Sequence, residues 1–234
     1  SYMLPLRQQA CRGRPVYFYD QAGCGGSPLP LTNTTTNASV ADVYPWLLTV
    51  EYYLLEELPA LIEHWGLSAY HIIGNSWGTI LSQVFALDAG ARSLSGLRSM
   101  VLSGPISQAK LYIDSQWSQV DGTVGSLPLY VQDRIRFLEE TRAYDSQEYQ
   151  DIVGALTSKF TIRTTPYPDC YLDSSSKMNE EIYVGMQGKS EFTIGGTLET
   201  LNITHRLVDV RVPVLLTHGK YDTMRPAVVQ AMQD

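Results

Sequence analysis

The sequence predicts an α/β protein with a mainly parallel sheet and a helical cap inserted between two of its strands. Over residues 1–105, short apolar runs typical of strands alternate with amphipathic runs typical of helices. This alternation predicts crossover helices that cover both faces of a parallel sheet. Strand patterns are sparse over residues 106–200 and return in residues 201–234. We therefore expect a core in two parts, 1–105 and 201–234, and a helical cap formed by 106–200.

Composition limits the possible partners. A chain of 234 residues, 44% of them hydrophobic, suits one α/β domain with an insertion. The net charge of −7 disfavours nucleic acid and anionic membrane surfaces as partners. The sequence contains no run of 18 apolar residues, so it predicts no membrane span. Cys11, Cys24 and Cys170 form no C-x-x-C pair, which predicts free thiols and a cytoplasmic location, while the oligomeric state stays open.

The first elements can be placed from local patterns. Val16–Tyr19 is typical of a buried central strand. The glycine-rich stretch 21–27 matches neither phosphate-loop pattern, so we expect only a tight loop at the end of that strand. Residues 28–39 predict an exposed loop. A helix should follow, capped by Asp42 and kinked or split by Pro59.

The most specific stretch is YHIIGNSWGTIL, residues 70–81. His71–Ile73 reads as a buried strand, and an amphipathic run from Thr79 to Ala89, closed by Gly90, reads as a helix. A serine in G-x-S-x-G between a strand and a helix has the nucleophile-elbow context, which predicts Ser76 as a nucleophile.

The neighbours of this serine fit the same interpretation. Gly74 and Gly78 are expected to be glycines because a Cβ at either position would collide where strand and helix close on the turn. The backbone N–H of Trp77, at the start of the helix, can point at a developing oxyanion.

The second half of the chain is mainly helical. Ser99–Leu102 and Val214–Thr217 read as buried strands, and Arg225-Pro226 should begin the last helix. The proline-rich stretch 166–168 should interrupt the helical region. The helices expected between the two strands are Lys110–Gln119, Leu129–Arg142, Ser146–Phe160 and Glu180–Met186.

Five stretches together carry a family resemblance: RPVYFYDQAGCGGS (14–27), GNSWG (74–78), MVLSGP (100–105), MQGKSEFTIGGTLETLNITHRL (186–207) and VPVLLTHGKYD (212–222). With them the chain resembles the proline iminopeptidases, serine peptidases of the α/β-hydrolase fold related to the tricorn interacting aminopeptidase and to amino-acid amidases. The resemblance implies a serine hydrolase without metal or cofactor that cleaves N-terminal proline or another small or apolar residue from peptides through an acyl-enzyme.

The resemblance also implies roles for four residues. Ser76 resembles the nucleophile, and Asp222 resembles the acid that orients a catalytic histidine. Trp77 supplies one oxyanion N–H. Glu191, in the S-E-F motif, resembles the carboxylate that binds the free α-amino group of the substrate, a task that suits an anionic acceptor.

The chain departs from the family pattern at three points. The triad order in this fold is Ser–Asp–His, yet no histidine follows Asp222. The histidines that are present are each expected to be structural: His64, His71, His205 and His218. The H-G-G-P-G oxyanion loop of the family is not found, and Thr223 stands where peptidases carry a second glutamate. These departures lead us to expect a fragment that is nearly inactive alone.

Other functions stay open. Thr223 keeps an amino-acid amidase or an esterase of the same fold as an alternative, since neither requires strict aminopeptidase specificity. Because the catalytic histidine is missing, a catalytically incomplete chain that only binds a partner is a further alternative. Haloalkane dehalogenases and epoxide hydrolases are disfavoured, because they need an aspartate where this chain has Ser76.

Overall fold

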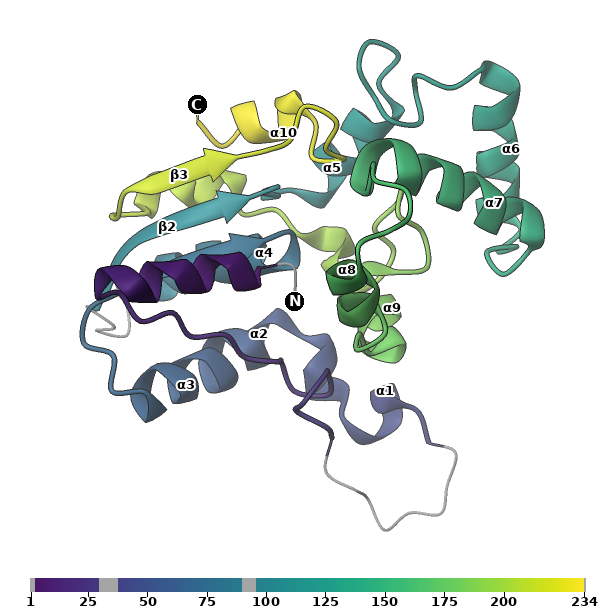
Figure 1. Cartoon of the computed structure of the whole chain (residues 1–234). Helices are drawn as coiled ribbons and strands as arrows, with labels where there is room; N and C mark the ends of the chain where they lie inside the picture. Colours follow the sequence, from purple (N-terminus) through teal and green to yellow (C-terminus); the bar gives the residue numbers. More distant parts are fainter. Residues whose placement is uncertain (1–2, 30–37, 90–95, 234) are drawn as a thin grey trace.

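A computed structural model describes residues 3–29, 38–89 and 96–233. Its centre is a three-stranded parallel sheet in the order β1-β2-β3 (Figure 1). The strands are β1 (Tyr70–Asn75), β2 (Leu97–Ser103) and β3 (Val214–Thr217). Most of the loop predicted over 28–39, and Gly90 as the end of a helix, lie outside the described residues.

Several short helical segments precede the sheet: a 3-10 helix at Leu4–Arg12, α1 (Val40–Val43), a 3-10 turn at Pro45–Leu48, α2 (Val50–Tyr52), a π turn at Tyr53–Glu57 and α3 (Leu58–His64). The prediction that Asp42 caps the first α-helix is wrong by three residues. Ser39 is the N-cap, and Asp42 completes the capping box from the third position. Pro59 lies in the first turn of α3, directly after the π turn, where its missing N–H is tolerated.

The prediction of a buried strand at Val16–Tyr19 is also wrong. The segment pairs with no strand in the described structure, and Tyr17 and Phe18 are exposed. Its rings pack instead on the end of α3, where Tyr17 stacks on Trp65 with centroids 4.8 Å apart. An apolar run specifies a strand only when a neighbouring backbone offers the hydrogen bonds of a ladder.

The sheet is covered mainly on one face, whereas the sequence predicted cover on both. Helix α4 (Trp77–Ala89) packs on the face that carries Met100 and Leu102, both 1% exposed. Ile73 and Leu215 align with Val101 on the opposite face and are 44% and 57% exposed. Because the strand order never reverses, right-handed crossovers place both connections on one face. The predicted burial is therefore wrong for His71 and Ile73 in β1. In β3 it is wrong for every residue except Leu216, which is half-buried.

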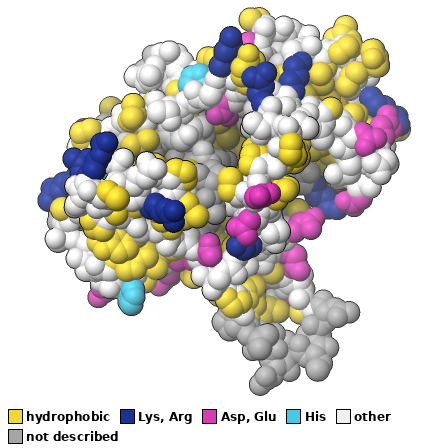
Figure 2. Space-filling model, in the orientation of Figure 1, with side chains coloured by type: hydrophobic (Ala, Val, Ile, Leu, Met, Phe, Trp, Pro, Cys, Tyr) yellow, Lys and Arg dark blue, Asp and Glu magenta, His cyan; other side chains and the backbone are white. Residues whose placement is uncertain are grey.

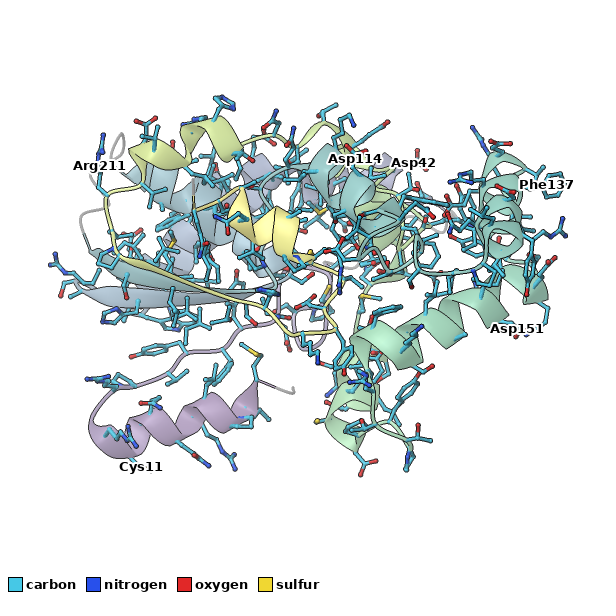
Figure 3. All side chains as sticks on the ribbon, turned by 90° about the horizontal axis from the view of Figure 1, so that it is seen from above. Cys11, Asp42, Asp114, Phe137, Asp151 and Arg211 are labelled. Atoms are coloured by element: carbon cyan, nitrogen blue, oxygen red, sulfur yellow. The ribbon has the colours of Figure 1, made fainter. Side chains whose placement is uncertain are left out.

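The N-terminal 3-10 helix lies beyond this open face. Cys11 on that helix is on the other side of the strands from α4, and the helix has no buried residue (Figure 3). The space-filling view shows exposed hydrophobic side chains on the side of the molecule that carries the sheet (Figure 2).

The region between β2 and β3 is mainly helical, as predicted. It contains α5 (Ala109–Trp117), α6 (Leu129–Glu140), α7 (Gln147–Leu156) with a π turn at Thr157–Thr161, α8 (Asp169–Ser175), α9 (Glu180–Gln187), and 3-10 turns at Thr197–Thr200 and Thr204–Asp209. Helix α10 (Pro226–Gln230) follows β3. The sequence missed α8, because Pro168 was read as a break, although a proline is tolerated just before a helix begins.

The helical region has a hydrophobic cluster of its own, separate from the one around the sheet. We call it the second cluster; its buried members are Val124, Ile135, Leu138, Tyr149, Leu156 and Phe192. At the far end of α6, Phe137 points away from the molecule (Figure 3). The second cluster supports a cap that packs partly on itself, and the boundaries 106 and 200 stay a prediction.

Within residues 3–29, 38–89 and 96–233, no helix has the length and apolarity to cross a membrane. The three cysteines are free. The same residues contain no group of three His, Cys, Asp or Glu side chains arranged to hold a metal ion.

Candidate active site

Ser76 lies in a sharp turn between β1 and α4. Its backbone has a φ of 49°, in the left-handed region that residues with a Cβ rarely adopt. The Ser76 N–H donates to the Ser103 carbonyl at 3.1 Å, which ties the turn to the end of β2. The side chain is exposed, and its hydroxyl has no hydrogen-bond partner among the described residues. This is the geometry of a serine held clear of the sheet and open to a substrate.

The two glycines of the turn differ in their roles. A Cβ on Gly74 would lie 2.3 Å from the Gly78 carbonyl oxygen and 2.7 Å from Ser82 Oγ, so Gly74 is required by the close approach of α4. A Cβ on Gly78 would have no described atom within 4 Å apart from its chain neighbours and the backbone of its own helix. The prediction that Gly78 prevents a collision is therefore wrong, since the turn contacts Gly78 through its backbone.

Trp77 is the first residue of α4, so its backbone N–H has no partner within the helix. Its indole Nε1 donates to Gln21 Oε1 at 3.1 Å, which brings the glycine-rich loop 21–27 against the elbow. Glu57 holds the same loop by accepting the Ala22 N–H at 2.7 Å. The loop therefore contributes to positioning Trp77, although its glycine pattern alone indicated only a tight turn.

Asp222 lies at the carboxyl end of the sheet, five residues after β3 ends. Its carboxylate accepts the Met224 N–H at 2.9 Å and the Gly219 N–H at 3.3 Å. Gly104, which follows β2 with a φ of +58°, would bring a Cβ within 3.3 Å of Asp222 Oδ2. The absent side chain of Gly104 thus leaves room for the carboxylate.

The strand register brings Ser76 and Asp222 to the same edge. Asn75 pairs with Ser103, which pairs with Thr217, so β1, β2 and β3 end level with one another. Strands β1 and β3 are two spacings apart, roughly 10 Å. The chain segments that carry Ser76 and Asp222 are therefore separated by the width of β2.

Glu191 joins this edge from the helical region. It is exposed and lines a cavity of about 170 Å³ together with Thr223, the residue after Asp222. The other walls come from α7 and its π turn, from α8, from the loop before α6 and from the residue after Glu191: Thr123, Val153, Leu156, Thr157, Phe160, Thr161, Tyr171 and Phe192. The cavity combines largely apolar walls with one carboxylate among its described lining residues.

Two tyrosines that the sequence did not single out hold Glu191. The Tyr183 hydroxyl on α9 donates to the Glu191 carboxylate, and the Tyr112 hydroxyl on α5 donates to the Glu191 carbonyl oxygen at 3.0 Å. Burial and the nearby Glu191 charge raise the pKa of both phenols, so both remain protonated donors. The Tyr112 hydroxyl also contacts the Thr223 side chain, which links the helical region to the segment that carries Asp222.

None of the four histidines is hydrogen-bonded to Ser76 or Asp222 within the described part of the chain. His71 Nδ1 is hydrogen-bonded to Ser99 Oγ at 2.6 Å, across β1 and β2. His71 was expected to be buried, but it lies on the open face of the sheet and is exposed. His64, His205 and His218 are exposed as well.

Comparison with known proteins identifies the fold and the family. Residues 3–231 match the α/β-hydrolase fold family. A proline iminopeptidase of Heyndrickxia coagulans is 32% identical over 231 residues, which cover 98% of this chain and 73% of the relative. A proline iminopeptidase of Clostridium botulinum is 30% identical over 236 residues, which cover 100% of this chain and 73% of the relative.

Solved structures give the same result. The crystal structure of VinJ superimposes with a TM-score of 0.83 at 27% identity, over 100% of this chain and 73% of its own. The proline iminopeptidase of Mycobacterium smegmatis superimposes with a TM-score of 0.74 at 27% identity, over 92% and 67% of the two chains. The chain therefore belongs to the α/β-hydrolase fold family and, within it, to the proline iminopeptidases, a family of aminopeptidase-type hydrolases.

Proposed function

We propose that the chain carries the site of a serine aminopeptidase that removes an N-terminal proline, or another small or apolar residue, from peptides through an acyl-enzyme. The observation that carries the proposal is the meeting of three parts at one sheet edge. These are the elbow serine Ser76, the aspartate Asp222 and the carboxylate of Glu191, which shares a cavity with Thr223.

In the proposed mechanism, Ser76 Oγ attacks the carbonyl carbon of the N-terminal residue while a general base takes its proton. The Trp77 N–H, at the positive end of α4, stabilises the oxyanion that forms. As the tetrahedral intermediate collapses, the same general base returns the proton to the leaving nitrogen, the C–N bond breaks, the shortened peptide is released and an ester remains on Ser76. Water then hydrolyses this ester by the same route.

The mechanism requires an imidazole between Ser76 and Asp222. The separation of β1 and β3 by two strand spacings, roughly 10 Å, leaves room for one. Asp222 would accept the Nδ1–H of this ring and stabilise the imidazolium. The Met224 and Gly219 amides fix the carboxylate that does so.

Glu191 is proposed to bind the free α-amino group. An ammonium ion that leaves water needs an anionic acceptor, and a charge-assisted hydrogen bond is roughly twice as strong as a neutral one. The apolar walls of the cavity, including Leu156, Phe160 and Phe192, suit a small apolar side chain next to that ammonium.

An amino-acid amidase or esterase is the second candidate. It is favoured by Thr223, which places a neutral side chain on the cavity wall where peptidases of the family carry a second glutamate. A series from L-prolinamide to L-prolyl dipeptides and longer peptides distinguishes the two, because an amidase loses activity as the leaving group lengthens.

The direct test of the amine role is ligand binding to a Ser76→Ala chain, in which turnover is removed. The ligands are L-prolinamide and N-acetyl-L-prolinamide, and their dissociation constants are measured by calorimetric titration. Glu191→Gln should weaken prolinamide by about 10- to 100-fold, the equivalent of losing a hydrogen bond to a charged group, and leave the blocked ligand unchanged. Equal affinity of the Ser76→Ala chain with and without Glu191→Gln for prolinamide would remove Glu191 from the mechanism.

The nucleophile is tested separately, with release of 4-nitroaniline from the prolyl anilide. Because no histidine of the described chain is hydrogen-bonded to Ser76, turnover is expected to be slow, and Ser76→Ala should abolish whatever remains above background. Turnover that persists in this variant would contradict the assignment of Ser76.

A further inference from the structure

The carboxylate of Glu139 is held in an unusual position. Glu139 is the penultimate residue of α6, near the negative end of the helix dipole, where a carboxylate is electrostatically disfavoured. Three hydroxyl groups donate to it. Those of Tyr149 (2.8 Å) and Ser190 reach Oε1, and that of Thr193 (3.2 Å) reaches Oε2.

We propose that Glu139 is a positioning residue of the candidate site, because it fixes the turn that presents Glu191. The inference rests on the proposed amine-binding role of Glu191. Ser190 and Thr193 flank that residue closely in sequence, so a carboxylate that binds both hydroxyls holds the turn from either side.

The hydrogen bonds of Ser190 show why the turn depends on Glu139. Ser190 Oγ accepts the N–H of Phe192 at 3.0 Å and that of Thr193 at 3.1 Å. A hydroxyl has two lone pairs and one proton, so these amides use its accepting capacity and leave its proton for Glu139. Ser190 is only 4% exposed, so water cannot readily replace the carboxylate as acceptor.

The neighbouring charges do not share this task. Glu139, Glu140, Arg136, Trp117 and Thr193 line an open cavity of about 350 Å³. The Arg136 guanidinium lies over the Trp117 ring at 4.5 Å and pairs with Asp133 at 2.8 Å. Glu140 is exposed and has no hydrogen bond or ion pair among the described residues. Glu139 therefore differs from Glu140 in that its carboxylate accepts hydrogen bonds from three hydroxyl groups.

Three helices therefore converge on Glu191. Helix α9 holds its carboxylate through Tyr183, α5 holds its carbonyl through Tyr112, and α6 holds its turn through Glu139. A carboxylate fixed in its binding position loses less entropy when a ligand ammonium binds, so removing one of these supports should lower the affinity for amines.

The test uses the full chain with Ser76→Ala, and the same two ligands, L-prolinamide and N-acetyl-L-prolinamide. Glu139→Ala should weaken prolinamide by about tenfold and change the affinity for the blocked ligand by less than about twofold. Glu139→Gln, which keeps one acceptor oxygen and the side-chain volume, should recover part of that loss. Glu140→Ala is the matched control and should leave both affinities unchanged.

A double mutant checks the route through Ser190. If Glu139 acts through this hydroxyl, Ser190→Ala and Glu139→Ala together should cost clearly less than the sum of their separate effects on prolinamide binding. Additive effects would overturn the route through Ser190 and with it the proposal.

The remaining outcomes are also decisive. Unchanged prolinamide affinity in Glu139→Ala, with the expected loss in Glu191→Gln, overturns the positioning role and leaves the proposed function intact. Loss of affinity for both ligands to the same degree indicates general unfolding of the turn and overturns it too. If Glu191→Gln weakens both ligands equally or neither, the proposed amine-binding role of Glu191 is wrong, and the positioning role of Glu139, which rests on it, is overturned as well. Should Glu139→Ala not fold, Glu139→Gln carries the same comparison.

Discussion

At the scale of the residue, the left-handed backbone of Ser76 costs conformational free energy, because Ser76 has a Cβ and glycine does not. A residue with a Cβ in the left-handed region costs roughly 1–2 kcal/mol, a penalty that glycine does not have. The proposed nucleophilic role accounts for a side chain at this position, because the attack that we propose requires a hydroxyl.

This cost can be measured with two variants that both lack the Ser76 hydroxyl. Ser76→Gly should have a free energy of unfolding about 1 kcal/mol higher than Ser76→Ala, because the alanine keeps the strained φ. Urea unfolding followed by circular dichroism provides the comparison. An alanine variant at least as stable as the glycine variant would contradict the strain at this position.

A second residue-scale prediction concerns Glu57, which holds the glycine-rich loop against the elbow. Burial raises the pKa of Glu57, although the hydrogen bond from Ala22 opposes this. The fold therefore favours the protonated acid, and this contribution to stability is lost as the pH rises from the ordinary glutamate value of 4.5 through the raised one. Glu57→Gln, which keeps an acceptor for the Ala22 N–H, should gain stability relative to wild type as the pH increases.

Thermal unfolding at about pH 4 and about pH 8 tests the sign. The difference in melting temperature between Glu57→Gln and wild type should be larger at the higher pH. Glu56→Gln, next in sequence and exposed, is the control and should show no such trend. A difference that shrinks as the pH rises would refute the assignment.

At the scale of the element, the junction of β1 and α4 offers two glycines with opposite expectations. Gly74→Ala would force a Cβ against the Gly78 carbonyl and should destabilise the protein by about 1–3 kcal/mol. Gly78→Ala meets open space within a helix and should be neutral or stabilising by up to about 1 kcal/mol. Chemical unfolding of both variants measures the contrast, and a similar loss in the two would contradict the geometry of the junction.

The same junction shows what the sequence could and could not predict. The elbow is encoded locally, since strand, glycine, serine and helix follow one another within residues 70–81, and its type and place were predicted correctly. Gly78 was misjudged, because the pattern does not tell which atoms of the turn approach one another. Val16–Tyr19 was misjudged because its apolar run does not state whether a partner strand lies beside it.

The candidate site was predictable only where a motif marks the residue. Ser76, Asp222 and Glu191 each lie in such a motif. Tyr112, Tyr183 and Glu139 do not. Tyr112 and Glu139 contact partners distant in sequence, and Tyr183 contacts a residue beyond the end of its own helix. A tyrosine or glutamate at helical spacing is equally compatible with a core or a surface position. The hydrogen-bond partners of these three residues could therefore be identified only in the structure.

At the scale of the whole molecule, the exposed apolar residues on the open face of the sheet should promote self-association of the protein. Ile73 and Leu215 are exposed on that face, with Val101 between them in the register. Contiguous exposed apolar surface favours association. Leu215→Thr should therefore reduce self-association in sedimentation velocity without a large change in unfolding free energy.

The control for this prediction is Val120→Thr, since Val120 is 94% exposed in a loop away from the sheet. Removing a single exposed valine there should not change the distribution of species. Equal effects of the two substitutions would show that total surface apolarity, rather than the open face, drives association.

The second cluster has a consequence for how such an enzyme diversifies. The turn that carries Glu191 is anchored to Glu139 and packs through Phe192 into the second cluster, while Ser76 is anchored to the sheet and α4. Mutations that reshape the cavity change the packing of the second cluster. Mutations that would displace Ser76 change the packing of the separate hydrophobic cluster around the sheet. Selection can thus explore new substrates in α7 and its π turn, which line the cavity, while the elbow that carries the proposed nucleophile is left untouched.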